Sequence, residues 1–360
     1  MITIGVDAHK RIHVALALDA TGRQLGQWRG PNSADGWDAL RRWATAQGEV
    51  RQWGIEGAWN YGRGLAQFLV TASETVYEVN PRWTALGRRS ARRPGKTDRL
   101  DAQSVALLVL REGAGLPSVA VEDETAVLDL LVTEREGALA EATRLRSQIH
   151  SLLLQIDPEY KQRLPTLTSA KGLRALLVFE DAATPLQFER AAAVRRAAQR
   201  LKLALEQAQE LAVQISARVV STGLAPLTQL CGVNLLTAAA LAGILGPGDR
   251  FASDAELAAY AGAAPLEASS AGQVRHRLNR GGNRRLNAIL YRIALTQSRH
   301  APTARAYLER RRAEGKTTRA AFRALKRFLV RHIWRLWQVC LRTNAVGAAR
   351  GSEIADAPSA

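Results

Sequence analysis

In the first part of the chain, short apolar runs typical of strands alternate with segments whose apolar residues recur at helical spacing. Runs rich in β-branched and aromatic residues predict five strands, at residues 2–6, 12–18, 24–29, 52–56 and 75–79. Between the third and fourth strands, Trp37, Leu40 and Trp43 recur at helical spacing behind an N-cap at Ser33. Mixed strands followed by helices predict an α/β layer fold for this N-terminal region.

Basic residues replace the apolar pattern from Pro81 to Lys96. The segment has few apolar positions, and its cations are Arg82, Arg88, Arg89, Arg92, Arg93 and Lys96. We predict a mobile basic loop or a short helix here, and a regular helix from Thr97 onward.

Two long helical patterns follow, over residues 121–155 and 188–220. Pro158 should end the first of them, because proline removes a helical hydrogen bond. The apolar spacing is too irregular for a firm coiled-coil prediction. The patterns therefore predict a helical spacer, which could also join two copies of the chain.

The C-terminal region reads as a series of helices. The apolar run Leu235–Leu245 between glycine turns resembles a helix-hairpin-helix, whose turn can offer N–H groups to a phosphate. A plain buried helix fits equally well. Further helices are predicted at residues 254–261, 283–297, 302–314 and 317–341, before an Ala-, Gly- and Ser-rich disordered tail from Asn344. The predicted domains are residues 1–115, 116–222, 223–343 and the tail 344–360.

Charge narrows the class of partner. The chain has 50 Lys and Arg against 33 Asp and Glu, a formal net charge of +17, which favours a nucleic-acid partner. An anionic membrane is the rival, but no anchor, signal peptide or bilayer-length apolar run is evident. Two cysteines without metal-ligand spacing fit a reducing compartment. We expect a cytoplasmic protein that does not bind membranes.

Four carboxylates stand where an α/β domain often places its chemistry: Asp7 and Glu56 at strand ends, and Asp98 and Asp101 one helical turn apart. Converging carboxylates repel one another unless cations neutralise them. Hard oxygen ligands favour Mg²⁺, and two such ions could clamp a phosphoryl transfer. Each residue alone has a plainer reading as turn, surface charge, helix cap or arginine partner. His9 reads as a surface or turn residue, with contact to substrate as the weaker alternative.

These residues lie in motifs that resemble a known family. The stretches Gly5–Lys10, Ile55–Gly57 and Lys96–Ala102 are similar to the DEDD transposase domain of IS110-type insertion sequences, a family that includes the Piv DNA invertases. The resemblance implies a ribonuclease H-like (RuvC-like) N-terminal domain. It assigns the Asp-Glu-Asp-Asp tetrad to Asp7, Glu56, Asp98 and Asp101.

The C-terminal region resembles the second domain of the same family, through residues 257–265, 269–272 and 280–286. In that family a serine a few residues after a proline is the nucleophile. Ser270 matches this position best and Ser269 is the alternative, because Ala271 stands before Gly272 where the family has glycine directly after the serine. No histidine stands at a spacing typical of a Ser-His-Asp triad. We therefore assign the activation of the serine to Mg²⁺.

Family membership also implies partners. They are donor and target double-stranded DNA, a structured bridge RNA, and further copies of the chain in a dimer or tetramer, all in a bacterial, nucleoid-associated setting. Candidate backbone contacts are Arg88, Arg89, Arg92, Arg93, Lys96, Arg275, Arg277, Arg280, Arg284 and Arg285. Trp59, Tyr61 and Trp83 could stack on bases, although core packing suits the tryptophans better.

The sequence thus predicts a Mg²⁺-dependent transposase or recombinase that forms a transient phosphoserine link. Two other readings stay open. A RuvC-like nuclease or junction resolvase would hydrolyse DNA with water and tolerate loss of both serines. A non-catalytic nucleic-acid-binding scaffold would tolerate loss of the carboxylates as well.

Overall fold

A computed structural model describes the backbone of residues 1–81, 83–84, 97–180, 183–248, 250–264, 266–267, 276–277 and 282–355; side chains are described for all of these except residues 266–267, 276–277 and 344–355. The chain forms two compact units. One contains residues 1–126, 226–233 and 244–360, and the other contains residues 127–225 and 234–243.

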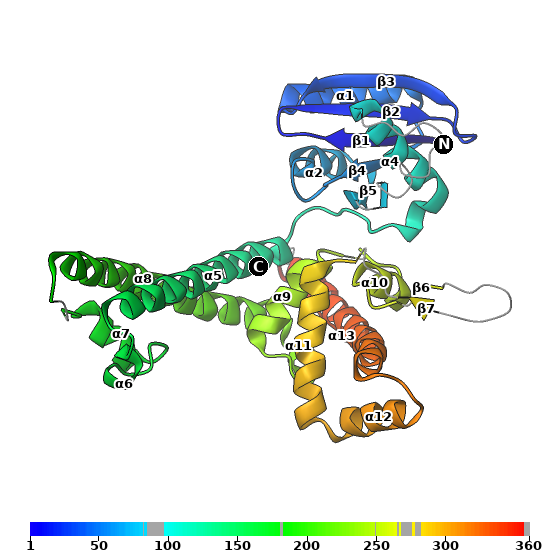
Figure 1. The fold of residues 1–360 in the computed structure, drawn as a ribbon. Coiled ribbons are helices and arrows are strands. Elements are labelled where there is room, and N and C mark those ends of the chain that lie inside the picture. The colour runs from blue at the N-terminus through cyan, green and yellow to red at the C-terminus, as the bar shows by residue number, and fades with distance from the viewer. Residues whose placement is uncertain are drawn as a thin grey trace, which may run out of the picture. The chain divides into compact units, whose positions relative to one another are not determined.

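A five-stranded mixed sheet forms the N-terminal region (Figure 1). Its strands are β1 (Ile2–Ala8), β2 (Ile12–Leu18), β3 (Gln24–Pro31), β4 (Arg51–Glu56) and β5 (Thr75–Val79). The order is β3-β2-β1-β4-β5, with β1, β2 and β3 antiparallel and β1, β4 and β5 parallel. All five predicted strands are present, and the predicted ribonuclease H-like α/β fold is confirmed.

Helices cover both faces of the sheet. They are α1 (Ala34–Gln47), α2 (Arg63–Thr71) and α4 (Asp98–Glu112), which a 3₁₀ turn at Gly113–Gly115 follows. The predicted N-cap is confirmed, because the Ser33 side chain accepts a hydrogen bond from the Gly36 N–H. Strand β2 contributes side chains to the apolar cores on both faces of the sheet. Ala15 lies in the core with α1 and α2, whereas Leu16 lies in the core with α4. This double burial explains why β2 is apolar from Val14 to Leu18 rather than alternating.

The second unit is helical. Its elements are α5 (Glu124–Ile156), most of which it contains, α6 (Tyr160–Arg163), α7 (Ala170–Leu177) and α8 (Pro185–Ser221). Both predicted long helices are confirmed, and α5 ends just before Pro158. One apolar core joins α5 to α8, for example through Leu145 and Leu201. A capping box at Thr184 begins α8.

The remaining elements are η2 (Ala225–Gln229), α9 (Leu235–Leu245), α10 (Asp254–Tyr260), β6 (Leu266–Glu267), β7 (His276–Arg277), α11 (Arg284–His300), α12 (Pro302–Ala313) and α13 (Thr318–Ala355). The predicted C-terminal helices are confirmed, whereas the two-residue strands β6 and β7 were not foreseen. The predicted tail from Asn344 is wrong as far as Ala355, because α13 continues through this alanine-rich stretch. Among the residues described, no helix is long and apolar enough to cross a membrane.

Candidate active site

The sheet itself brings the first two carboxylates together. Asp7 lies near the end of β1 and Glu56 ends β4, and the parallel register pairs these two residues. Directly paired residues of neighbouring strands project to the same face of a sheet. Asp7 is only 7% exposed, so its carboxylate stands at the buried margin of this edge.

Helix α4 delivers the other two carboxylates to the same edge. It packs so closely on β1 that a Cβ at Gly5 would lie 2.2 Å from the Ala102 carbonyl oxygen and 2.3 Å from the Ala106 nitrogen. Glycine is therefore the residue that lets backbone meet backbone here. This contact sets the first turn of α4 beside the end of β1, where Asp7 lies.

The first turn of α4 is capped by Thr97, whose side chain accepts a hydrogen bond from the Leu100 N–H. Because Thr97 is the cap, Asp98 does not have the capping role that its plainer reading allowed. Asp98 and Asp101 both lie in the first turn, where the partial positive charge of the helix N-terminus favours carboxylates. Asp101 is 6% exposed, whereas Asp98 faces solvent.

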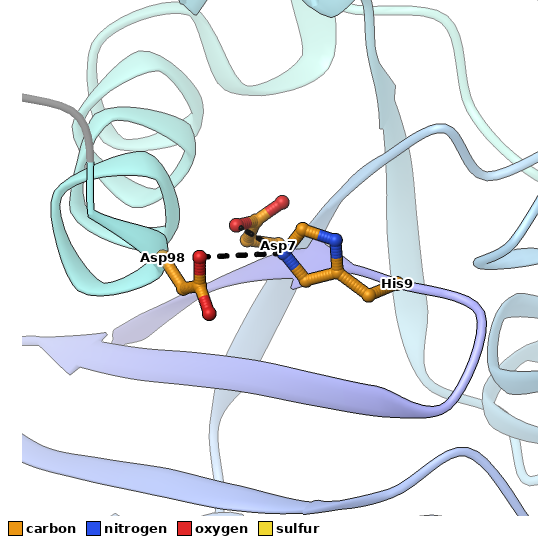
Figure 2. A group of neighbouring side chains, drawn as sticks. All are labelled: Asp7, His9 and Asp98. Atoms are coloured by element: carbon orange, nitrogen blue, oxygen red, sulfur yellow. Dashed lines mark hydrogen bonds and ion pairs between the residues drawn. The ribbon is translucent and has the colours of Figure 1, made fainter.

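His9 lies between two of the acids, as Figure 2 shows. Its Nε2 is 3.0 Å from Asp7 Oδ2 and 3.6 Å from Asp98 Oδ1. One possible ligand atom from each of these three residues lies within 4.8 Å of the others. The reading of His9 as a plain surface or turn residue therefore missed its place at the site. The signal was available in the sequence, since residues two apart on an extended segment share a face.

Burial and charge both act on Asp7. Desolvation raises the pKa of its carboxyl group above the usual value, and the negative charges of Asp101 and Asp98 raise it further, while His9 lowers it. Asp7, Asp98 and Asp101 thus lie close enough for their negative charges to act on one another. An imidazole nitrogen is a more typical ligand of transition metals, whereas the carboxylate oxygens suit a hard divalent cation such as Mg²⁺ and so fit the predicted metal. Such an ion would supply positive charge for phosphoryl transfer.

The other predicted site residues fall mostly outside the described residues. This applies to Ser269 and Ser270, and to the cations Arg88, Arg89, Arg92, Arg93, Lys96, Arg275 and Arg280. Arg277 lies in β7, where only the backbone is described. Arg284 and Arg285 begin α11, the first exposed and the second half-buried. Their roles stay predictions.

The three aromatic candidates differ in their surroundings. Trp59 packs against the core beneath α1 and α2, and its indole N–H donates to Glu78 Oε2 over 3.2 Å. Trp83 packs against the core of α4. Tyr61 is 50% exposed. The tryptophans thus have the packing role that the sequence favoured, and Tyr61 is left as the candidate for stacking on a base.

A ribonuclease H-like sheet that carries Asp7 and Glu56 at paired strand positions, with Asp98 and Asp101 in the first turn of the helix packed on it, has the layout of the DEDD class of transposase domain. A family model for the DEDD transposase of IS110, described as a transposase, matches residues 4–158. A second model, described as "Transposase IS116/IS110/IS902 family", matches residues 224–309. The two matches occupy the N-terminal and C-terminal regions in the predicted order.

Two proteins of insertion elements are similar to the chain. The IS110 uncharacterized 43.6 kDa protein of Streptomyces coelicolor is 30% identical over 275 residues, which cover 64% of this chain and 68% of that protein. The IS116 uncharacterized 44.8 kDa protein of Streptomyces clavuligerus is 27% identical over 195 residues, 54% of this chain and 46% of that protein. The chain belongs to the IS110 family of DEDD transposases. This family implies DNA as the substrate and its cleavage as the activity.

Proposed function

We propose that the chain cuts and rejoins DNA through a transient phosphoserine link, with Mg²⁺ held by Asp7, Glu56, Asp98 and Asp101. Ser270 is the proposed nucleophile, and Ser269 is the alternative. The observation that carries the proposal is the gathering of Asp7, His9 and Asp98 at one sheet edge, with their possible ligand atoms within 4.8 Å of one another. The register of Asp7 with Glu56 extends that cluster to the neighbouring strand.

In the proposed reaction the serine Oγ forms a bond to the scissile phosphorus while the bond from phosphorus to the 3′ oxygen breaks. The serine loses its proton and the departing 3′ oxygen gains one. The strand is left with a free 3′ hydroxyl group and a 5′ phosphate esterified to the serine. Attack by the 3′ hydroxyl of another strand reverses these changes and frees the serine, so no ATP is consumed. The lack of a P-loop motif in the sequence fits this scheme.

The carboxylates supply the geometry of this reaction. Asp7 and Glu56 are fixed by strand pairing, and Asp98 and Asp101 by the packing of α4 on β1. Bound Mg²⁺ would stabilise charge on the attacking and leaving oxygens. A site built on strands and a packed helix suits this task, because phosphoryl transfer depends on positioning more than on covalent chemistry.

The proposal includes guidance by a structured bridge RNA, which would pair with donor and target DNA. The charge of +17 supports a chain that holds two kinds of polyanion. If cations make these contacts, the affinity for DNA and RNA should fall steeply with salt, because each phosphate contact releases counterions. A flat salt response would contradict an electrostatic interface.

We also infer that the chain acts as a homo-oligomer, a dimer or a tetramer. Large apolar side chains on the two long helices stay exposed: Leu130 and Leu154 on α5, and Leu203 and Val213 on α8 are each more than 50% exposed. Exposed apolar surface of this kind is a common feature of protein interaction sites. Efficient cleavage by a monomer with its DNA would contradict this inference.

The decisive experiment looks for a covalent protein–DNA adduct that survives detergent and requires Mg²⁺. The wild-type chain should form it with element-end DNA and RNA, and Ser270→Ala should abolish it if Ser270 is the nucleophile. Loss in Ser269→Ala alone would transfer the role to Ser269. Ser151→Ala is the control, since Ser151 is an exposed serine of α5 in the helical unit.

The same assay tests the metal site. Asp98→Ala should reduce adduct formation by at least about 10³-fold, since phosphoryl transfer relies on charge stabilisation. Asp35→Ala is a close control, because Asp35 is also an exposed aspartate in the first turn of a capped helix. DNA cleavage that survives loss of both serines would favour a water-using nuclease. Full biological activity in Asp98→Ala would favour a non-catalytic scaffold.

A further inference from the structure

The segment that carries both serines begins and ends at one place. It leaves α10 after Tyr260 and enters α11 through Asn283, whose backbone N–H donates to the Tyr260 carbonyl oxygen over 2.6 Å. One turn further on, Asn287 Nδ2 donates to the Ala261 carbonyl oxygen over 2.7 Å. Lys326 from α13 donates to Asn287 Oδ1 over 2.8 Å and so fixes which way that amide points. The two ends are therefore joined by directed hydrogen bonds.

Two glycines make this junction sterically possible. A Cβ on Gly282 would lie 2.2 Å from the Gly262 nitrogen and 2.4 Å from its Cα. Gly262 itself has φ of +64°, a conformation that other residues rarely adopt. The incoming and outgoing backbones thus touch each other, and a side chain at Gly282 would force them apart.

The Tyr260 hydroxyl group is the centre of the junction. It accepts one hydrogen bond from Asn283 Nδ2 and one from the Arg250 guanidinium, each over 3.1 Å. The Tyr260 ring packs against Phe251, and the Arg250 guanidinium lies 5.0 Å from the centre of the Tyr260 ring. A hydroxyl oxygen can accept two such bonds, so Tyr260 links the start of α11 to Arg250.

Arg250 connects Tyr260 to the five-stranded sheet that carries Asp7 and Glu56. It is 6% exposed and forms an ion pair with Glu78 of β5, and its guanidinium lies 5.2 Å from the ring centre of Trp59. Glu78 also accepts from the Trp59 indole N–H. Trp59 follows the strand that ends in Glu56. Residues 1–126 and 244–360 belong to the same compact unit, so these contacts lie within it.

We propose that Tyr260, Asn283 and Arg250 form a clamp that holds both ends of the serine-bearing segment against β5, the strand next to the one that ends in Glu56. Glu78 pairs with Ile55 and so projects from the opposite face of the sheet to Glu56. They are positioning residues for the attacking serine rather than catalytic residues. This inference rests on the proposed function, since it assigns the clamp to the same phosphoserine reaction. The clamp would act in the same way whether the carboxylates come from the same copy of the chain or from another. In either case it holds the serine-bearing segment of the copy to which the clamp belongs.

Two conservative variants separate the clamp from the stability of the fold. Tyr260→Phe removes only the hydroxyl group and keeps the ring in its apolar contacts. Asn283→Ser keeps an effective N-cap for α11, whose Leu286 N–H now donates to Asn283 Oδ1, but is too short to reach Tyr260. Arg250→Ala is a poorer probe, because it would leave Glu78 as an uncompensated charge at a largely buried position.

The experiment measures the single-turnover rate of adduct formation at saturating DNA and RNA, per folded protein. Tyr260→Phe and Asn283→Ser should each lower this rate about tenfold, since misplacement of a reacting group by about 1 Å can cost 10²-fold. The dissociation constant for DNA should change less than about twofold, because neither group contacts DNA in this proposal. The double variant should be no slower than the slower single variant, since both changes break the same link.

Tyr291→Phe is the control, because Tyr291 is a half-exposed tyrosine on α11. Its rate should equal that of the wild type. Wild-type rates in Tyr260→Phe and Asn283→Ser, or losses that multiply in the double variant, would overturn the clamp. If the wild-type chain forms no adduct, the proposed function fails and the clamp falls with it. An adduct in the wild type with unaffected variants overturns the clamp alone.

Discussion

The two ends of the proposed active site are held by different means. The carboxylate edge is fixed by backbone: strand pairing sets Asp7 against Glu56, and α4 rests on the bare backbone of Gly5. The base of the serine segment is fixed partly by backbone, through the Asn283 N–H and the Tyr260 carbonyl oxygen, and partly by side chains, through the Asn283 amide and the Tyr260 hydroxyl group. Backbone ladders tolerate most side-chain changes, whereas a side-chain network can lose its geometry with a single hydroxyl group.

This difference matches what each end must do. Metal ligands have to stay within a few tenths of an ångström of one geometry, and rigid elements provide that. A nucleophile that attacks, forms a covalent link and is released again needs a fixed base, and Tyr260 and Asn283 would provide one. Changes at Gly5, Asp7 and Asp254 test how far this contrast holds.

The largest effect is expected at Gly5. Gly5→Ala would drive a Cβ into backbone atoms of α4, which cannot move aside as the end of a side chain can. Overpacking of this kind costs about 3 kcal/mol of unfolding free energy. Because α4 carries Asp98 and Asp101, adduct formation should also fall by about 10²-fold or more. Chemical denaturation and the adduct assay measure the two effects.

Gly137→Ala is the matched control. Gly137 lies within α5, and among the described residues no heavy atom lies within 4 Å of its would-be Cβ. Alanine in a helix interior is about 1 kcal/mol more favourable than glycine, so this variant should be more stable than the wild type. Equal stability of the two variants would show that backbone contact does not fix the carboxylate edge.

The contrast also explains what the sequence could and could not predict. The strands and the long helices follow from apolar periodicity, which acts over a few residues, whereas the assignment of the tetrad is what the family resemblance implies. The contact of His9 with Asp7 and Asp98 forms where the end of β1 meets the start of α4. From the sequence, only the side shared by His9 and Asp7 could be expected, because residues two apart on an extended segment lie on the same face. The link from Glu78 to Arg250 joins residues far apart in the sequence, and no local pattern announces it.

The second prediction concerns charge at the carboxylate edge. Burial and neighbouring acids raise the pKa of Asp7, so in the metal-free protein the folded state binds this proton more tightly than the unfolded state. Stability should therefore fall as pH rises from the ordinary value of 3.8 through the raised pKa, and stay lower above it. Asp7→Asn should remove this penalty and stabilise the metal-free protein at pH 7 by about 1 kcal/mol.

Bound Mg²⁺ should reverse the order of stability of the wild type and Asp7→Asn. Mg²⁺ at 100 times its dissociation constant should stabilise the wild type by about 2.7 kcal/mol, because it binds the folded state alone. Asp7→Asn should lose most of that gain, while Asp35→Asn, which changes an exposed aspartate that is not part of the cluster, should keep it. Thermal melting with Mg²⁺ and with EDTA measures this. An equal metal response in Asp7→Asn would remove Asp7 from the metal site.

The smallest effect is expected at Asp254, which ties α10 to α13 by side chains. Its Oδ2 lies 2.6 Å from an Arg327 guanidinium nitrogen and 3.4 Å from Arg331 Nε, and the Arg327 hydrogen bond is the main cause of a lowered Asp254 pKa. A lowered pKa means stability that is present above the unfolded value and lost as pH falls through the folded one. The pair is partly exposed, so solvent screening limits its worth to about 0.5 kcal/mol. Asp254→Asn should lose that amount at pH 7 and progressively less as the pH falls through the folded-state pKa of Asp254, as measured by urea denaturation over that pH range. Helix α10 begins at Asp254 and ends at Tyr260. A loss of adduct formation greater than about twofold in Asp254→Asn would therefore mean that contacts with α13, as well as contacts with the sheet, hold the clamp in place.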